Sequence, residues 1–156
     1  MSYSEILGQL ESYITNAFNL RYDQQYSEDS VARWVGINDR ICPMNVPATS
    51  DCSSFVTWIY WTMFGNGPDI LNGEGWSAGY TGTLWDHGTL VSDGNFVVGD
   101  ICIYGTSYPF DHAAIYLGGG YVISHGTDSD SAANWKVGVN DFGSGLPLAG
   151  CRRYVI

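Results

Sequence analysis

The sequence predicts an α+β fold in which N-terminal helices pack on a central antiparallel sheet. Apolar residues recur at helical spacing near the N-terminus, whereas short runs of β-branched and aromatic residues, separated by glycine turns, fill the chain from residue 96 onward. Helices followed by strands, without alternation between the two, are typical of this class. The 156 residues contain no linker or repeat, so residues 1–156 are expected to fold as one domain.

The first expected element is an amphipathic helix. Ser2 followed by Glu5 forms a capping box, and the apolar residues after it recur on one helical face. These apolar residues are Ile6, Leu10, Tyr13, Ile14, Ala17 and Phe18. Residues 19–49 hold prolines and charged residues and are expected to be irregular, apart from a short helical pattern at residues 31–35.

A second helix is expected to begin at or near Cys52. The side chains of residues 49–51 can cap it, and glycines follow the apolar stretch that ends at Met63. Residues 68–94 are rich in glycine, asparagine, aspartate and aromatic residues, a composition typical of a long surface loop that forms the wall of a substrate site. Strands are expected at residues 96–98, 101–104, 113–117 and 121–123.

The charge excludes several classes of partner. A formal charge of -10 repels a phosphate backbone and gives no attraction to anionic lipid, so neither nucleic acid nor a membrane surface is an expected partner. No apolar run approaches the roughly 18 residues that a membrane span needs. The N-terminus also lacks the basic and apolar regions of a secretory leader, so the protein is expected to be made in the cytoplasm.

The cysteines do not form a metal motif. Cys42, Cys52, Cys102 and Cys151 lack CxxC spacing, so neither a structural metal nor another cofactor is expected. If one cysteine is catalytic, the other three allow at most one disulfide, and none is expected in a reducing cytosol.

Cys52 is the candidate nucleophile. At the start of a helix, the helix dipole and the unpaired backbone N–H groups favour a thiolate. The N–H of Cys52 itself is also placed to donate to an oxyanion when the sulfur attacks a carbonyl. The alternative is that Cys52 is a small buried hydrophobic residue, which is the commonest role of cysteine. The position of Cys52 alone does not decide between the catalytic and the structural role.

A cysteine nucleophile needs a base, and histidine suits that task near neutral pH. The chain has three histidines, His87, His112 and His125. His87 lies in the predicted loop, where it is expected to be a solvated side chain. His112 stands at the start of a predicted strand and is the expected base.

The hairpin after His112 decides which residue can orient it. If Gly119-Gly120 is a two-residue turn, position 112 lies opposite 127 and shares a sheet face with His125. His125 is then the third member of the catalytic set. A three-residue turn shifts the register by one and places Ser124 on that face instead.

Three segments together resemble the NlpC-type cell-wall cysteine peptidases. Residues 51–56, Asp-Cys-Ser-Ser-Phe-Val, resemble the family signature Asp-Cys-Ser-Gly-Phe-Val. Residues 98–104 resemble the family's Pro-Gly-Asp-Leu strand, and residues 112–118 resemble its histidine strand. The segments at 80–83, 123–126 and 152–154 are similar to the catalytic domains of phage lysins within this group.

The resemblance implies a papain-like fold with the catalytic cysteine at a helix N-terminus. It implies Cys52 as nucleophile, His112 as base and His125 as the polar third residue. No metal or cofactor takes part in this chemistry.

The resemblance also implies a tyrosine near the oxyanion site, for which Tyr26 is the candidate rather than Tyr22. Asp51 and Ser53 are further candidates for contact with the substrate or the oxyanion. Ser54 replaces the usual glycine, a change expected to narrow the cleft beside the nucleophile. The family's upstream Tyr-x-Trp-Gly-Gly segment is absent.

The implied activity is hydrolysis of an amide bond in bacterial peptidoglycan by a phage-type lysin that is made in the host cytoplasm and acts on the cell wall. The bond is either within the stem peptide, as for an endopeptidase, or between stem and glycan, as for an amidase. Two alternatives remain open at this point, a non-catalytic phage or wall-binding module and an acyltransferase of the same fold. The sequence leaves the oligomeric state undetermined.

Overall fold

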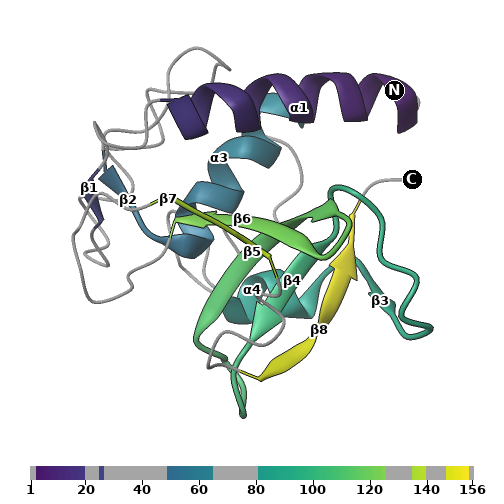
Figure 1. Cartoon of the computed structure of the whole chain (residues 1–156). Helices are drawn as coiled ribbons and strands as arrows, with labels where there is room; N and C mark the ends of the chain where they lie inside the picture. The colour runs from purple at the N-terminus through teal and green to yellow at the C-terminus, as the bar shows by residue number, and fades with distance from the viewer. Residues whose placement is uncertain are drawn as a thin grey trace.

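The computed structural model describes residues 3–19, 25–26, 49–64, 81–125, 135–139 and 147–154. The helices are α1 (Tyr3–Asn19), α3 (Cys52–Phe64) and α4 (Thr81–Asp86). The strands are β1 (Gln25–Tyr26), β2 (Thr49–Ser50), β3 (Thr89–Val91), β4 (Ile101–Tyr104), β5 (His112–Gly118), β6 (Tyr121–His125), β7 (Trp135–Val139) and β8 (Leu148–Arg153). Figure 1 shows α1 and α3 on one side of the main sheet, with β1 and β2 beside the start of α3.

The main sheet has six strands in the order β3-β8-β4-β5-β6-β7. Every neighbouring pair in it is antiparallel. Strand β8, near the C-terminus, lies between β3 and β4 and pairs with both. The α+β class with helices on an antiparallel sheet is therefore confirmed, and the helices expected at the N-terminus and at Cys52 are both present.

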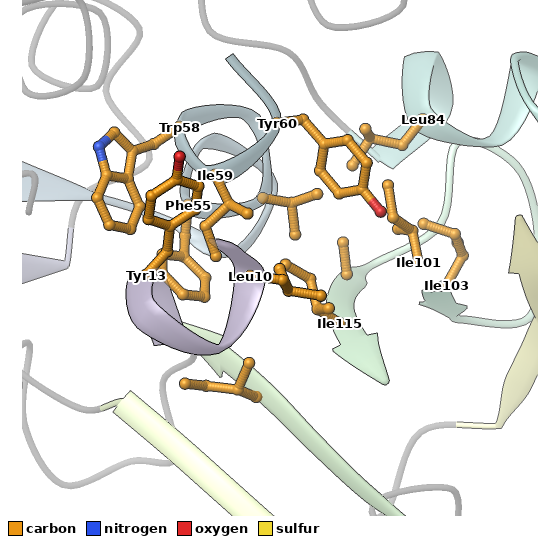
Figure 2. Close-up of a cluster of buried hydrophobic side chains, with 13 residues drawn as sticks. Leu10, Tyr13, Phe55, Trp58, Ile59, Tyr60, Leu84, Ile101, Ile103 and Ile115 are labelled. Carbon is orange, nitrogen blue, oxygen red and sulfur yellow. The ribbon is translucent and has the colours of Figure 1, made fainter. Parts of the chain in front are cut away.

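The core lies between the helices and one face of the sheet. Figure 2 shows side chains of α1 and α3 meeting strand residues such as Ile101, Ile103 and Ile115. Every residue from Asp51 to Tyr60 is buried, so α3 is enclosed around its whole circumference at its N-terminal end, as expected for a helix with apolar residues on all sides. The start of α3 is thus packed on all sides by the rest of the protein.

The opposite face of the sheet carries a second, smaller cluster. It consists of Cys102, Tyr104, Ala114, Val122 and Cys151. Beside it, the guanidinium of Arg153 forms an ion pair with the buried carboxylate of Asp100 at 2.7 Å. This contact joins the C-terminal strand to the turn that precedes β4.

Two expectations about residues 68–98 are wrong. Residues 81–86 form α4 and residues 89–91 form β3, although this stretch was expected to be a loop. Burial overrides the loop-like composition here, because Leu84 enters the core and β3 pairs with β8. Residues 96–98 form no strand, because the backbone turns back there through a hydrogen bond from the N–H of Asp100 to the carbonyl of Val97.

The short helix expected at residues 31–35 and the first part of the 68–94 stretch lie outside the described residues. Within the described helices, none combines the length and apolar character needed to cross a bilayer.

Candidate active site

Asp51 caps the helix that begins at Cys52. Its Oδ1 accepts hydrogen bonds from the backbone N–H of Ser54 at 2.9 Å and from the Ser54 hydroxyl at 2.7 Å. The Ser54 hydroxyl also accepts from the backbone N–H of Asp51 at 2.8 Å, which completes a reciprocal capping arrangement. Ser54, which replaces a glycine of the family signature, therefore acts as part of the cap.

Cys52 occupies the first position of α3, as predicted. Its side chain is buried, with 5% of its surface exposed, and the N-terminal end of the helix dipole acts on it directly. Ser53 follows it and is also buried, and its hydroxyl donates to Oδ1 of Asp51 at 3.3 Å. Asp51 and Ser53 thus lie on either side of Cys52, the candidate nucleophile, and their contact with a substrate or an oxyanion stays a prediction.

A buried contact joins the approach to Cys52 with the end of β6. The hydroxyl of Ser50 lies 2.6 Å from Nδ1 of His125, and neither side chain is exposed to solvent. Ser50 ends β2 and is separated from Cys52 by Asp51 alone. His125 is therefore held beside the segment that carries the nucleophile.

The sequence did not identify Ser50 as a partner of His125. Its position before Asp51 predicted only a capping role, and the two residues are 75 positions apart in the chain. A serine two residues before a candidate nucleophile was the only available signal.

The predicted register between β5 and β6 is wrong by one residue. The turn itself is as predicted, because Gly118 pairs with Tyr121 around a two-residue turn. The register then shifts between Tyr116 and Gly118, and Tyr116 pairs with Val122. A β-bulge at Leu117 adds one unpaired residue, which has the same effect on register as a longer turn.

The bulge changes which residues share a face. Because Ile115 pairs with Ile123, strand alternation puts Ser124 on the face of His112. His125 then shares the other face with Ile123, which belongs to the helix-side core. The shared face that was expected for His112 and His125 is therefore not observed, although His125 still reaches the Cys52 segment through Ser50.

His112 is the first residue of β5 and pairs with Tyr104 of β4. The two rings lie 5.8 Å apart between centroids, and His112 is half-buried. The helix that begins at Cys52 packs against both β5 and β6. Ser124 is buried on β6, and its hydroxyl has no hydrogen-bond partner within the described part of the chain.

Tyr26 is brought to the site by the small parallel sheet. β1 pairs with β2 so that Gln25 lies opposite Thr49 and Tyr26 lies opposite Ser50. The backbone of Tyr26 is thus adjacent to the strand that leads into Cys52. The alternative, Tyr22, lies outside the described residues.

His87 differs from the expected solvated loop histidine. It directly follows α4, is half-buried, and places Nδ1 2.8 Å from the carbonyl oxygen of Thr83. Its own carbonyl accepts a hydrogen bond from Nε of Arg152. His87 is therefore tied to the end of α4 and to the C-terminal strand.

Two further cysteines form a pair that the sequence did not predict. Cys102 of β4 lies directly opposite Cys151 of β8, with 2.8 Å between the sulfur atoms. The two thiols are hydrogen-bonded and do not form a disulfide. The hydrogen bond with Cys151, together with burial, raises the pKa of the Cys102 thiol. Within the described residues, no group of histidine, cysteine and carboxylate side chains is arranged to hold a metal ion.

The family model described as the NlpC/P60 family matches residues 33–137. A search of the curated proteins gives no match.

Solved structures resemble the chain at low sequence identity. The NlpC/P60 domain of the peptidoglycan hydrolase SagA has a TM-score of 0.59 and 23% identity, with 93% of this chain and 98% of that one covered. The peptidoglycan hydrolase RipB from Mycobacterium tuberculosis has a TM-score of 0.59 and 18% identity, over 100% of this chain and 69% of that one.

A third neighbour is NlpC2 from Trichomonas vaginalis, with a TM-score of 0.59, 19% identity and 94% of this chain covered. The chain spans 46% of the length of that structure. At these identities the likeness establishes the papain-like fold.

Proposed function

Since the family model covers more than half of its length, the chain belongs to the NlpC/P60 family, and from this premise we propose that it is a peptidoglycan hydrolase. Structural neighbours that are themselves named as peptidoglycan hydrolases support the proposal. The observation that carries it is the capped start of α3, where Ser50, two residues before Cys52, is in buried contact with His125.

In the proposed first step, the Cys52 thiolate attacks an amide carbonyl of the peptidoglycan stem. A bond forms between Sγ and the carbonyl carbon, and the oxyanion is stabilised by backbone N–H groups at the start of α3. The carbon–nitrogen bond then breaks, and the departing amine takes a proton from His112. The product of this step is a thioester on Cys52 and a free amine.

The second step releases the enzyme. His112 takes a proton from a water molecule, whose oxygen attacks the thioester carbonyl, and the sulfur–carbon bond breaks to give a carboxylate and the Cys52 thiolate. His125, fixed by Ser50, is the polar third residue in this proposal. Tyr26, Asp51 and Ser53 contribute to the oxyanion site or to substrate contact.

Purified sacculi test the proposal directly. Incubation with the wild-type chain, followed by mass spectrometry, is expected to yield fragments with a new amine end and a new carboxyl end. The mass of the fragments identifies the bond as a stem-peptide bond or the amide between stem and glycan. Cys52→Ala is the matched control and is expected to release nothing.

Two results would contradict hydrolysis. Binding to sacculi without released fragments indicates a wall-binding module. Fragments whose new acyl end carries an amine or alcohol in place of water indicate an acyltransferase.

We also propose that the chain is a phage-type lysin, on the strength of the segments at residues 80–83, 123–126 and 152–154. A lysin made in the host cytoplasm acts on the wall only after the membrane barrier fails. Expression inside a susceptible bacterium is therefore expected to lyse cells only when the membrane is permeabilised. Lysis without permeabilisation contradicts this part of the proposal.

A further inference from the structure

Cys102 and Cys151 belong to the cluster on the sheet face opposite the helices. They lie directly opposite each other on β4 and β8, and their sulfur atoms are 2.8 Å apart. Neither side chain is exposed to solvent. The hydrolysis proposed for Cys52 uses neither thiol, so the pair is a second cysteine site that the proposed function does not explain.

The backbone already holds the two cysteines at the spacing of a disulfide. Residues directly opposite each other in an antiparallel pair have Cα atoms about 4.5–5.5 Å apart, inside the range of about 4.4–6.8 Å that disulfides need. A disulfide bond is about 2.0 Å long, so the sulfur atoms have to approach by only about 0.8 Å. Neither strand has to change its register for this, because the two residues are already paired.

A bond at this position would enclose a large part of the sheet. The two cysteines are 49 positions apart in the chain, and the segment between them contains β5, β6 and β7. A cross-link removes conformational freedom from the unfolded chain, and this effect grows with the length of the enclosed loop. A bond between β4 and β8 is therefore expected to stabilise the fold.

The surroundings of the pair leave a route for a small reagent. The residues that border the cluster are only partly buried, namely Val91, Phe96, Tyr116 and Leu148. On the far side of β8 from β4 lies β3, a strand of three residues of which the first two are exposed. Short strands at the edge of a sheet open locally at a lower free-energy cost than the core, and such opening gives access to the thiols.

We propose that Cys102 and Cys151 form a reversible disulfide that clamps β4 to β8, with a low-molecular-weight disulfide such as oxidised glutathione as the oxidant. A reducing cytosol keeps the pair as two thiols, and an oxidising environment outside the cell favours the bond. The proposal does not depend on the hydrolysis of peptidoglycan.

The reaction is two successive thiol–disulfide exchanges. One cysteine loses its proton and attacks a sulfur of oxidised glutathione, whose disulfide bond breaks to give a mixed disulfide and one glutathione thiolate. The second cysteine loses its proton and attacks the mixed disulfide, which releases the other glutathione thiolate. Two protein thiols are thereby oxidised to one disulfide, and one oxidised glutathione is reduced to two thiols that take up the two protons.

Formation of the bond can be mapped in the full chain. The Cys52→Ala variant is used, because the candidate nucleophile would itself react with the oxidant. The chain is incubated with oxidised or with reduced glutathione just below its unfolding midpoint, where local opening does not limit the reaction. Remaining thiols are alkylated in denaturant, and the peptides are analysed by mass spectrometry without reduction. Peptides joined through Cys102 and Cys151 are expected in the oxidised sample only.

Thermal unfolding measures the clamp. Oxidation is expected to raise the unfolding midpoint of the Cys52→Ala chain by about 10 °C, given the length of the enclosed loop. Adding Cys102→Ala or Cys151→Ala should abolish the difference between the oxidised and reduced samples, whatever it does to the midpoint itself. Adding Cys42→Ala is the matched control and should leave that difference unchanged.

Several results would overturn the proposal. Cys102 and Cys151 that are both alkylated after oxidation show that no bond forms between them, and a bond from either one to Cys42 shows a different pairing. A mapped bond that leaves the midpoint unchanged or lowers it overturns the clamp. The peptide map decides the pairing even if a Cys102→Ala chain fails to fold, and a chain that cuts no sacculi can still form the bond.

Discussion

The two histidines of the candidate site occupy different environments. His125 is completely buried, with Nδ1 held 2.6 Å from the Ser50 hydroxyl. His112 is half-buried at the start of β5, with its ring near that of Tyr104. His125 is held by its contact with Ser50, whereas part of the His112 side chain is exposed and open to a substrate.

This difference indicates which task each histidine can perform. A base that protonates a departing amine must contact the substrate, and an accessible imidazole meets that requirement. A buried imidazole whose nitrogen is held by a neighbouring hydroxyl is suited to positioning other groups. The comparison is consistent with the proposal that His112 transfers protons and His125 positions other groups, and the following experiments test that proposal.

Loss of Cys52, the proposed nucleophile, has the largest expected effect, because both histidines are proposed to act through it. Cys52→Ser should reduce fragment release from sacculi more than about a hundredfold while leaving the fold intact. Circular dichroism and thermal unfolding check the fold. Activity above about a hundredth of the wild-type value means that another residue is the nucleophile.

Alkylation separates Cys52 from the paired cysteines. At about pH 6, iodoacetamide should label Cys52 first, because only a thiolate reacts readily. Cys102 should react last, since its pKa is raised by the hydrogen bond with Cys151 and by burial. Peptide mapping measures the order, and equal labelling of Cys52, Cys102 and Cys151 contradicts the proposed activation of Cys52.

Replacement of the accessible histidine comes next. His112→Ala should lower kcat by about a thousandfold, because the leaving amine and the attacking water both lose their proton-transfer partner. The slope of kcat/KM against pH near neutrality should disappear as well. A variant that keeps this pH dependence shows that His112 is not the titrating base.

The buried histidine should matter less. His125→Ala is expected to cost about a hundredfold in kcat, whereas Ser124→Ala, on the opposite face of β6, should cost less than about threefold. His125→Gln should recover part of the loss, because it keeps a hydrogen-bonding group for Ser50. If Ser124→Ala is the more damaging change, the sheet face that carries His112 and Ser124 forms the site. Ser124 then takes the positioning role proposed for His125.

Much of the fold was accessible from the sequence, because local patterns determine it. The helical spacing of Leu10 and Tyr13 and the capping residues before Cys52 identified α1 and α3, and the apolar runs identified β4, β5 and β6. The strand at residues 148–153 was missed because Gly150 interrupts it. A Cβ atom there would lie 3.1 Å from the Trp85 ring, closer than an ordinary van der Waals contact, so the glycine lets the strand approach that ring.

The site was less predictable, because its contacts depend on tertiary structure. The bulge at Leu117 leaves no mark in the sequence, since the glycines after it permit turns of either length. The same holds for the contact between Ser50 and His125, which joins two strands through residues 75 positions apart in the chain. The candidate residues could be identified from their type and motif. The sheet face on which each lies, and the side chains that each contacts, depend on the three-dimensional structure.

An effect smaller than that of His125→Ala is expected at Ser50, which is proposed to act through His125. Ser50→Ala removes the hydroxyl at Nδ1 and leaves the imidazole in place, so kcat should fall about tenfold, less than in His125→Ala. Ser50→Thr keeps the hydroxyl and should retain more activity than alanine if the added methyl group fits. In the His125→Ala background, Ser50→Ala should have almost no further effect, because residues that act as a unit are not additive. Full additivity of the two substitutions indicates that Ser50 supports the backbone before Cys52 rather than the histidine.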